Sequence, residues 1–130
     1  MTTNDFIFRL ISEYSKRYES NDTELMHLKE IISVGLIGED NLERRNAARI
    51  VHFFMRKTLI EEDNPDWSAA KVLKDLYDCR TCVDHVAQMY VKGIMEAKGK
   101  NIFGMRNIVD EKEADDIILR VFDEAFRIKD

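Results

Sequence analysis

The sequence predicts an all-α protein. Apolar residues recur at three- and four-residue spacing along nearly the whole chain, as the buried face of a helix requires. The 130 residues include one proline and five glycines, which leaves little room for β-turns. One helical pattern also occurs twice. We therefore expect two tandem three-helix repeats, residues 1–62 and 63–130, packed about a pseudo-twofold axis as a single domain.

Three helices are expected in the first half. The first covers about residues 4–19, where Phe6, Leu10 and Tyr14 lie on one face. The second starts near Asn21 and stops at Gly35, because glycine adopts the left-handed conformation that ends a helix. The third is expected to open with a capping box and to bury one apolar stripe. The box is Asp40 with Glu43, and the stripe is Ala47, Ile50, Val51 and Phe54.

Three more helices are expected in the second half of the chain. Asn64 and Pro65 are typical of an N-cap and a first helical residue, so a fourth helix is predicted to follow them. Its apolar residues are Trp67, Ala70, Leu73, Leu76 and Tyr77. The fifth helix is expected over residues 81–92. Asp110 and Glu113 form a second capping box, which opens the sixth helix.

The repeat is an ungapped match between residues about 58 positions apart. The matched pairs are Thr23 with Thr81, His27 with His85, Ile31 with Met89, Gly35 with Gly93 and Leu36 with Ile94. After the glycine the copies differ, because the second has a loop about nine residues longer, which contains Gly99, Phe103 and Gly104. Long loops within compact domains often carry function, so this difference marks a candidate site.

The pattern resembles the S-layer homology repeat, a helical module that anchors bacterial surface proteins to cell-wall polysaccharide. The second copy matches through Gly93-Ile94, the loop at Phe103 and the helix from Val109 onward. The first copy matches from Val34 through Gly35 and again from Leu42 onward. The resemblance implies a helical fold and a role for Arg44, which occupies the position of the arginine that holds the wall polymer. Glu111 stands at that position in the second copy.

The two helix starts carry opposite charge. Carboxylates are favourable in the first turn of a helix, but Arg44 and Arg45, which Arg49 follows about one turn later, lie where positive charge is mildly unfavourable. One explanation is an anionic ligand held by guanidinium groups, and the other is pairing with the acidic helix or a solvated face. The candidate ligand-binding residues are these three arginines with Lys100, Phe103 and Arg106 of the longer loop.

Cys79, Cys82 and His85 suggest a metal site, because Cys-x2-Cys is a common zinc-ligand spacing. A structural zinc site needs four ligands, and the sequence has no second such pair. We therefore expect Cys82 to be a reduced, packed thiol and expect no metal or cofactor. A disulfide is not expected between residues one helical turn apart in a cytoplasmic chain.

Function is predicted to be non-catalytic binding, because no nucleophile, acid–base pair or phosphate-binding loop stands out. The favoured partner is another protein or a second copy of the chain. The alternative is acidic cell-wall polysaccharide, and a minor alternative is a metal protein or enzyme that uses Cys79 to His85. The net charge of −5 argues against nucleic acid, and no apolar run is long enough to span a membrane. The expected location is the cytoplasm if Met1 is the natural start, and the cell surface if the chain is a fragment.

Overall fold

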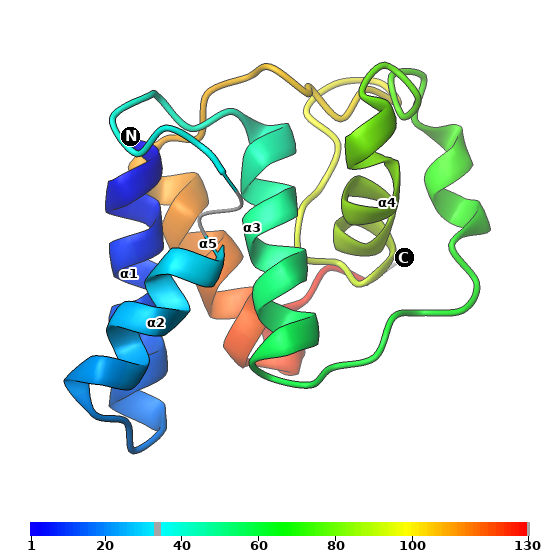
Figure 1. Ribbon diagram of the computed structural model, residues 1–130. Coiled ribbons are helices and arrows are strands. Elements are labelled where there is room, and N and C mark those ends of the chain that lie inside the picture. Colours follow the sequence, from blue (N-terminus) through cyan, green and yellow to red (C-terminus); the bar gives the residue numbers. More distant parts are fainter. Residues whose placement is uncertain (33–34, 130) are drawn as a thin grey trace.

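The computed structural model describes residues 1–32 and 35–129, and within them it contains five α-helices, three short 3-10 helices and no strand (Figure 1). The α-helices are α1 (Thr3–Arg17), α2 (Asp22–Ile32), α3 (Arg44–Lys57), α4 (Val83–Val91) and α5 (Glu111–Phe122). The 3-10 helices are η1 (Ser68–Val72), η2 (Arg80–Cys82) and η3 (Glu124–Phe126). The predicted all-α class is confirmed. No helix among the described residues is long and apolar enough to cross a membrane.

The helices α1, α3 and α5 begin at equivalent points, at the upper edge of the molecule in Figure 1. Three backbone hydrogen bonds join their leading residues in a closed ring. The Leu42 amide donates to the Met1 carbonyl (2.9 Å), the Val109 amide to the Leu42 carbonyl (2.9 Å), and the Met1 nitrogen to the Val109 carbonyl (3.0 Å). Each of these residues lies two positions before its helix begins. The arrangement therefore relates three helix starts, and two tandem three-helix units are not confirmed.

The buried apolar side chains form one cluster that draws on all five helices and the loops between them. Its largest fully buried apolar members include Phe6 of α1, Phe54 of α3, Met89 of α4 and Phe103 of the long loop. The stripes expected on α1, α3 and α5 face this cluster, as their periodicity predicts.

The predicted fourth helix is wrong. Only η1 forms there, because short polar side chains bind the backbone locally. Asn64 Oδ1 accepts from the Asp66 amide (3.1 Å), and Asp66 Oδ1 accepts from the Ser68 amide (3.0 Å). The Lys74 amide then donates to the Asn101 carbonyl (2.8 Å) instead of continuing a helix. Ala70, Leu73 and Leu76 are still buried without an α-helix and Trp67 is partly buried, but the expected burial of Tyr77 is wrong, since it is 60% exposed.

The helix boundaries are partly as predicted. Gly93 has φ +73° and ends α4 with two backbone bonds, from its own amide to Tyr90 and from the Ile94 amide to Met89. Gly35 has φ +75°. Ser33, Val34 and Asp130 lie outside the described residues, as does the side chain of Ile31.

Of the four predicted helix caps, two form, and the N-cap at Asn64 fails because η1 is preceded by Trp67. Asn21 caps the Glu24 amide (2.8 Å), and Asp110 caps the Glu113 amide (2.8 Å), as expected. The box at Asp40 and Glu43 is wrong, because α3 begins only at Arg44 and the Glu43 side chain makes no cap bond.

Candidate functional site

Arg44 connects three parts of the chain from within the core. Its Nε lies 3.1 Å from Glu113 Oε2 on α5, and its Nη2 donates to the Glu96 carbonyl at 2.7 Å. Its Nη1 donates to the Phe103 carbonyl, and the guanidinium carbon lies 4.4 Å from the centroid of the Phe103 ring. Burial lowers the pKa of Arg44, and the adjacent Glu113 carboxylate opposes that shift.

This geometry identifies Arg44 as a structural residue. Its side chain is 1% exposed and lines a small pocket of about 190 Å³ together with Glu96 and Lys98. The expected pairing of an arginine with the acidic helix is present, between Arg44 and Glu113 of α5. Phe103 is wholly buried under the same guanidinium. Contact of Arg44 or Phe103 with a ligand stays a prediction.

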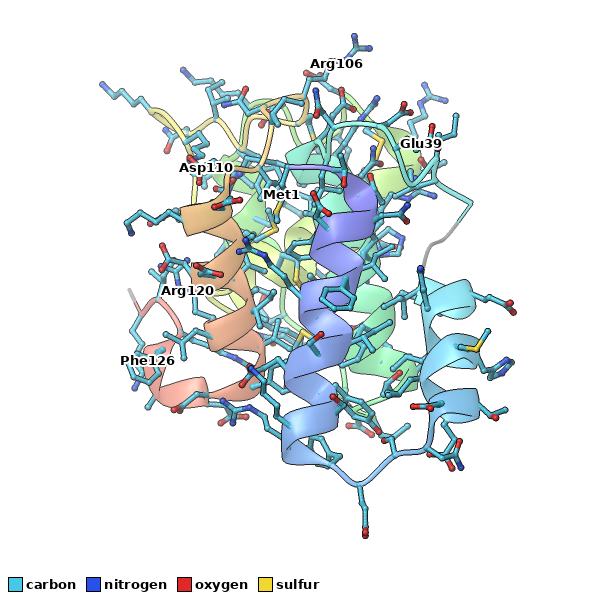
Figure 2. All side chains as sticks on the ribbon, turned by 90° about the vertical axis from the view of Figure 1, so that its left-hand side faces the viewer. Met1, Glu39, Arg106, Asp110, Arg120 and Phe126 are labelled. Carbon is cyan, nitrogen blue, oxygen red and sulfur yellow. A yellow bond between two sulfur atoms is a disulfide. The ribbon has the colours of Figure 1, made fainter. Side chains whose placement is uncertain are left out.

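The other four candidate residues differ in burial. Arg45 Nε pairs with Glu43 (2.8 Å), and Arg49 Nη1 donates to Asn46 Oδ1 (3.3 Å) within α3. Lys100 and Arg106 are exposed on the long loop, and Figure 2 shows Arg106 pointing away from the molecule. The Arg45 amide donates to the Met105 carbonyl at 3.0 Å, so the start of α3 lies against the loop beside Arg106.

The loop owes its shape to Asp75. The two carboxylate oxygens of Asp75 accept from the amides of Phe103 and Gly104, each at 2.9 Å. Gly104 has φ +82°, which suits a residue without a side chain. Asp75 and Arg44 thus hold the loop from two sides, which makes it a packed element of the core.

The cysteine prediction is wrong. Cys79 and Cys82 form a disulfide, and their Cα atoms lie 5.2 Å apart, within the range that a disulfide spans. The reason is local, because Cys79 has extended backbone and precedes η2, so the pair is not placed on a regular α-helix. Bonded sulfurs are not thiolate ligands, and no group of three or more His, Cys, Asp or Glu side chains is placed to hold a metal in the described part of the chain.

A chain of hydrogen bonds links Asp63, His52 and His85, and sequence reasoning missed it. His52 Nε2 lies 2.6 Å from Asp63 Oδ1, and His52 Nδ1 lies 2.8 Å from His85 Nδ1. Burial lowers the pKa of His85, and the nearby charges of His52 and Arg49 lower it further. Residues 33 positions apart on α3 and α4 carry no shared signal in a single sequence, so only the packing reveals the pair.

A pocket of about 420 Å³ adjoins the two histidines, and Trp67 and Gln88 also line it. Gln88 is fixed by reciprocal bonds to the backbone of Asn64, at 2.8 and 3.0 Å. Both ring nitrogens of His52 are thus hydrogen-bonded, one to Asp63 and one to His85. No serine or cysteine lines the pocket.

A second groove, of about 470 Å³, runs between α1 and α5. Figure 2 looks onto this face, with α2 on the other side of α1. Phe8 of α1 is 70% exposed and Leu119 of α5 is 39% exposed, whereas Ile118 beneath them is buried. Charged residues form its borders, including an ion pair of Arg9 with Asp115 at 2.9 Å. An apolar strip within a charged border is typical of a protein-binding groove.

Comparison of the chain with protein-family models, with curated proteins and with solved structures found no match.

Proposed function

We propose that the chain is a non-catalytic interaction module whose α1/α5 groove binds an amphipathic helix of a partner protein or of a second copy. The observation that carries the proposal is a difference among α1, α3 and α5, whose starts are equivalent. Other helices pack over α1 and α3 more fully than over α5. α2 packs against α1 and α3, and α4 packs against α3. After α5 the described chain forms only η3 and an extended segment, which joins α4 through a bond from the Ile128 amide to the Gly93 carbonyl.

Equivalent residues show what this difference exposes. The fifth residue is buried in α1 (Ile7) and in α3 (Ala48), but in α5 it is Asp115, whose side chain is 70% exposed. The ninth residue is partly buried against the core in α1 (Ile11) and buried in α3 (His52). In α5 the ninth residue is the exposed Leu119. The α5 face therefore presents an apolar side chain at a position that the other two helices cover.

The border of the groove limits what binds there. Arg9 bridges to Glu111 and Asp115, and Arg17 pairs with Glu13, so both signs of charge line the two helices. A helix with an apolar stripe at i, i+3 and i+7 and mixed charge beside it complements such a surface. The proposed binding involves no catalytic step.

Co-purification under native conditions tests the proposal. We expect wild-type protein to retain a stoichiometric partner or to form dimers, and the Leu119→Asp variant to lose either. Ile60→Asp is the matched control, because Ile60 is an exposed apolar residue that does not line the groove. The proposal would be contradicted if wild type, Leu119→Asp and Ile60→Asp, each shown to be folded by circular dichroism, retained equal amounts of partner or formed equal amounts of dimer.

Binding of acidic cell-wall polysaccharide is the second candidate function. It is favoured by the exposure of Lys100 and Arg106 on the long loop. Sedimentation with purified cell walls tests it, with the double variant Lys100→Glu, Arg106→Glu as the comparison. This candidate would be contradicted if wild type did not sediment with cell walls, or if the double variant sedimented with them equally well.

A further inference from the structure

The Cys79–Cys82 disulfide closes the turn that leads into α4, on the side of the molecule away from α1 (Figure 1). It joins the only two cysteines of the chain. Cys79 is the residue before η2, and Cys82 is the N-cap of α4. Neither cysteine lines the α1/α5 groove.

The two sulfur-bearing residues differ in access to solvent. Cys79 is partly exposed, whereas Cys82 is 1% exposed. Thiol–disulfide exchange needs a line of approach to one sulfur and a stable leaving thiolate on the other. The structure provides this asymmetry, with Cys79 as the sulfur open to attack and Cys82 as the leaving group.

The surroundings of Cys82 favour a thiolate. As the N-cap of a nine-residue helix it lies at the positive end of the helix dipole, next to first-turn amides that have no partner within the helix. The Thr81 hydroxyl lies 3.6 Å from Cys79 Sγ and 4.0 Å from Cys82 Sγ, so it can donate to either sulfur. Both features lower the free energy of a thiolate on Cys82 once the disulfide opens.

Stabilisation of the fold is a weak reason for this bond. A cross-link between residues three apart removes little entropy from the unfolded chain, because the benefit grows with the length of the closed loop. A backbone hydrogen bond from Cys82 to Cys79 (2.9 Å) already closes the same turn.

We propose that Cys79–Cys82 is a thiol–disulfide exchange site that reacts with a dithiol substrate. One substrate thiolate attacks Cys79 Sγ, the bond between Cys79 and Cys82 breaks, and its electron pair goes to Cys82 Sγ, which takes up a proton. The second substrate thiolate attacks the first substrate sulfur and releases Cys79 as a thiolate, which is then protonated. The protein disulfide is reduced by two electrons, and the substrate dithiol becomes a disulfide.

Single-cysteine variants and glutathione disulfide test this assignment. In Cys82→Ser the remaining Cys79 thiolate is expected to form a mixed disulfide with glutathione, measured by mass spectrometry. In Cys79→Ser the same reaction at the buried Cys82 is expected to be at least about tenfold slower. Equal rates in the two variants would overturn the assignment of Cys79 as the exposed, reacting sulfur.

Reduction of the wild-type protein separates an exchange site from a structural bond. Dithiothreitol is expected to reduce the disulfide in the folded chain, and the helical circular-dichroism signal is expected to persist. A disulfide that opens only after denaturation, or whose reduction unfolds the chain, would overturn the proposal. Thr81→Val is expected to slow the reduction while the fold is retained.

Discussion

The helices α2 and α4 carry the same residue pattern, yet their surroundings differ. In α4 the residues Val86, Ala87, Gln88 and Met89 are all buried, whereas in α2 only Leu28 and Ile32 are buried among the side chains described. Part of the difference lies in what packs against them, because η1 packs onto α4 and the C-terminal segment bonds to Gly93 directly after it, whereas the described helices that pack on α2 are α1 and α3. A repeated sequence pattern thus specifies helix, stop and turn, and the packing of other segments decides burial.

One cluster of ion pairs joins the segments that pack around the end of α4. Glu61 receives Lys92 at 2.7 Å and Arg127 at 2.9 Å, which joins the end of α4 to the segment before η1 and to the C-terminus. Burial raises the pKa of Glu61, but its hydrogen bonds with Arg127 and Lys92 prevail and lower it.

The largest expected effect comes from Arg44, which fastens the loop that only the second copy has. Arg44→Met leaves two carbonyls without donors and leaves the Glu113 carboxylate with Lys98, 3.2 Å from the same oxygen, as its remaining cation, so we expect a loss of about 3 kcal/mol in unfolding free energy. Denaturant unfolding measures it. Arg45→Met is the control, since its pair with Glu43 is partly exposed and is expected to contribute less than about 1 kcal/mol. Equal losses would show that Arg44 is not the structural centre.

The second largest effect is expected at Gly93, where substitution should cost more unfolding free energy than at Gly35, the matching glycine of the first copy. Gly35→Ala places a side chain at positive φ in open space, for a cost of about 1 kcal/mol. Gly93→Ala adds a clash, because its Cβ would lie 2.2 Å from the Ile128 carbonyl oxygen. We expect about 3 kcal/mol for Gly93→Ala, by thermal or denaturant unfolding. A smaller loss at Gly93 than at Gly35 would mean that the C-terminal segment does not pack there.

His27 of α2 and His85 of α4 occupy matching positions, and only His85 is expected to make the stability of the fold depend on pH. Because the pKa of His85 is lower in the folded state, the unfolded chain binds more protons as the pH falls below the ordinary histidine value. Stability should therefore decrease on acidification through that window, by up to about 1.4 kcal/mol per pH unit. His85→Gln is expected to flatten this part of the profile. His27→Gln, on the exposed side of α2, is the control, and an identical change in both variants would contradict the account.

The smallest effect is expected for the exposed cations of the long loop. Lys100→Ala and Arg106→Ala should each change the unfolding free energy by no more than about 0.5 kcal/mol. A larger loss would place these residues among the contacts that hold the loop, together with Arg44 and Asp75.

Local signals predicted the elements well. Periodicity located α1, α3 and α5, and the caps at Asn21 and Asp110 and the left-handed glycines lay where expected. Long-range contacts were not predictable in the same way. The burial of Arg44 depends on Glu96, Phe103 and Glu113, which meet only in the folded chain. Asn64 and Asp66 bind the nearby backbone, which is why a helix signal at Pro65 gave no α-helix.

The central claim is that the groove between α1 and α5, which no helix of the described chain covers, binds a partner helix. The most direct test places a photoreactive amino acid at position 8 in the groove and, as control, at position 60 outside it. Cross-linking from position 8 to a defined protein or to a second copy, without cross-linking from position 60, is the predicted result. Equal cross-linking at both positions, or none at position 8, would contradict the claim.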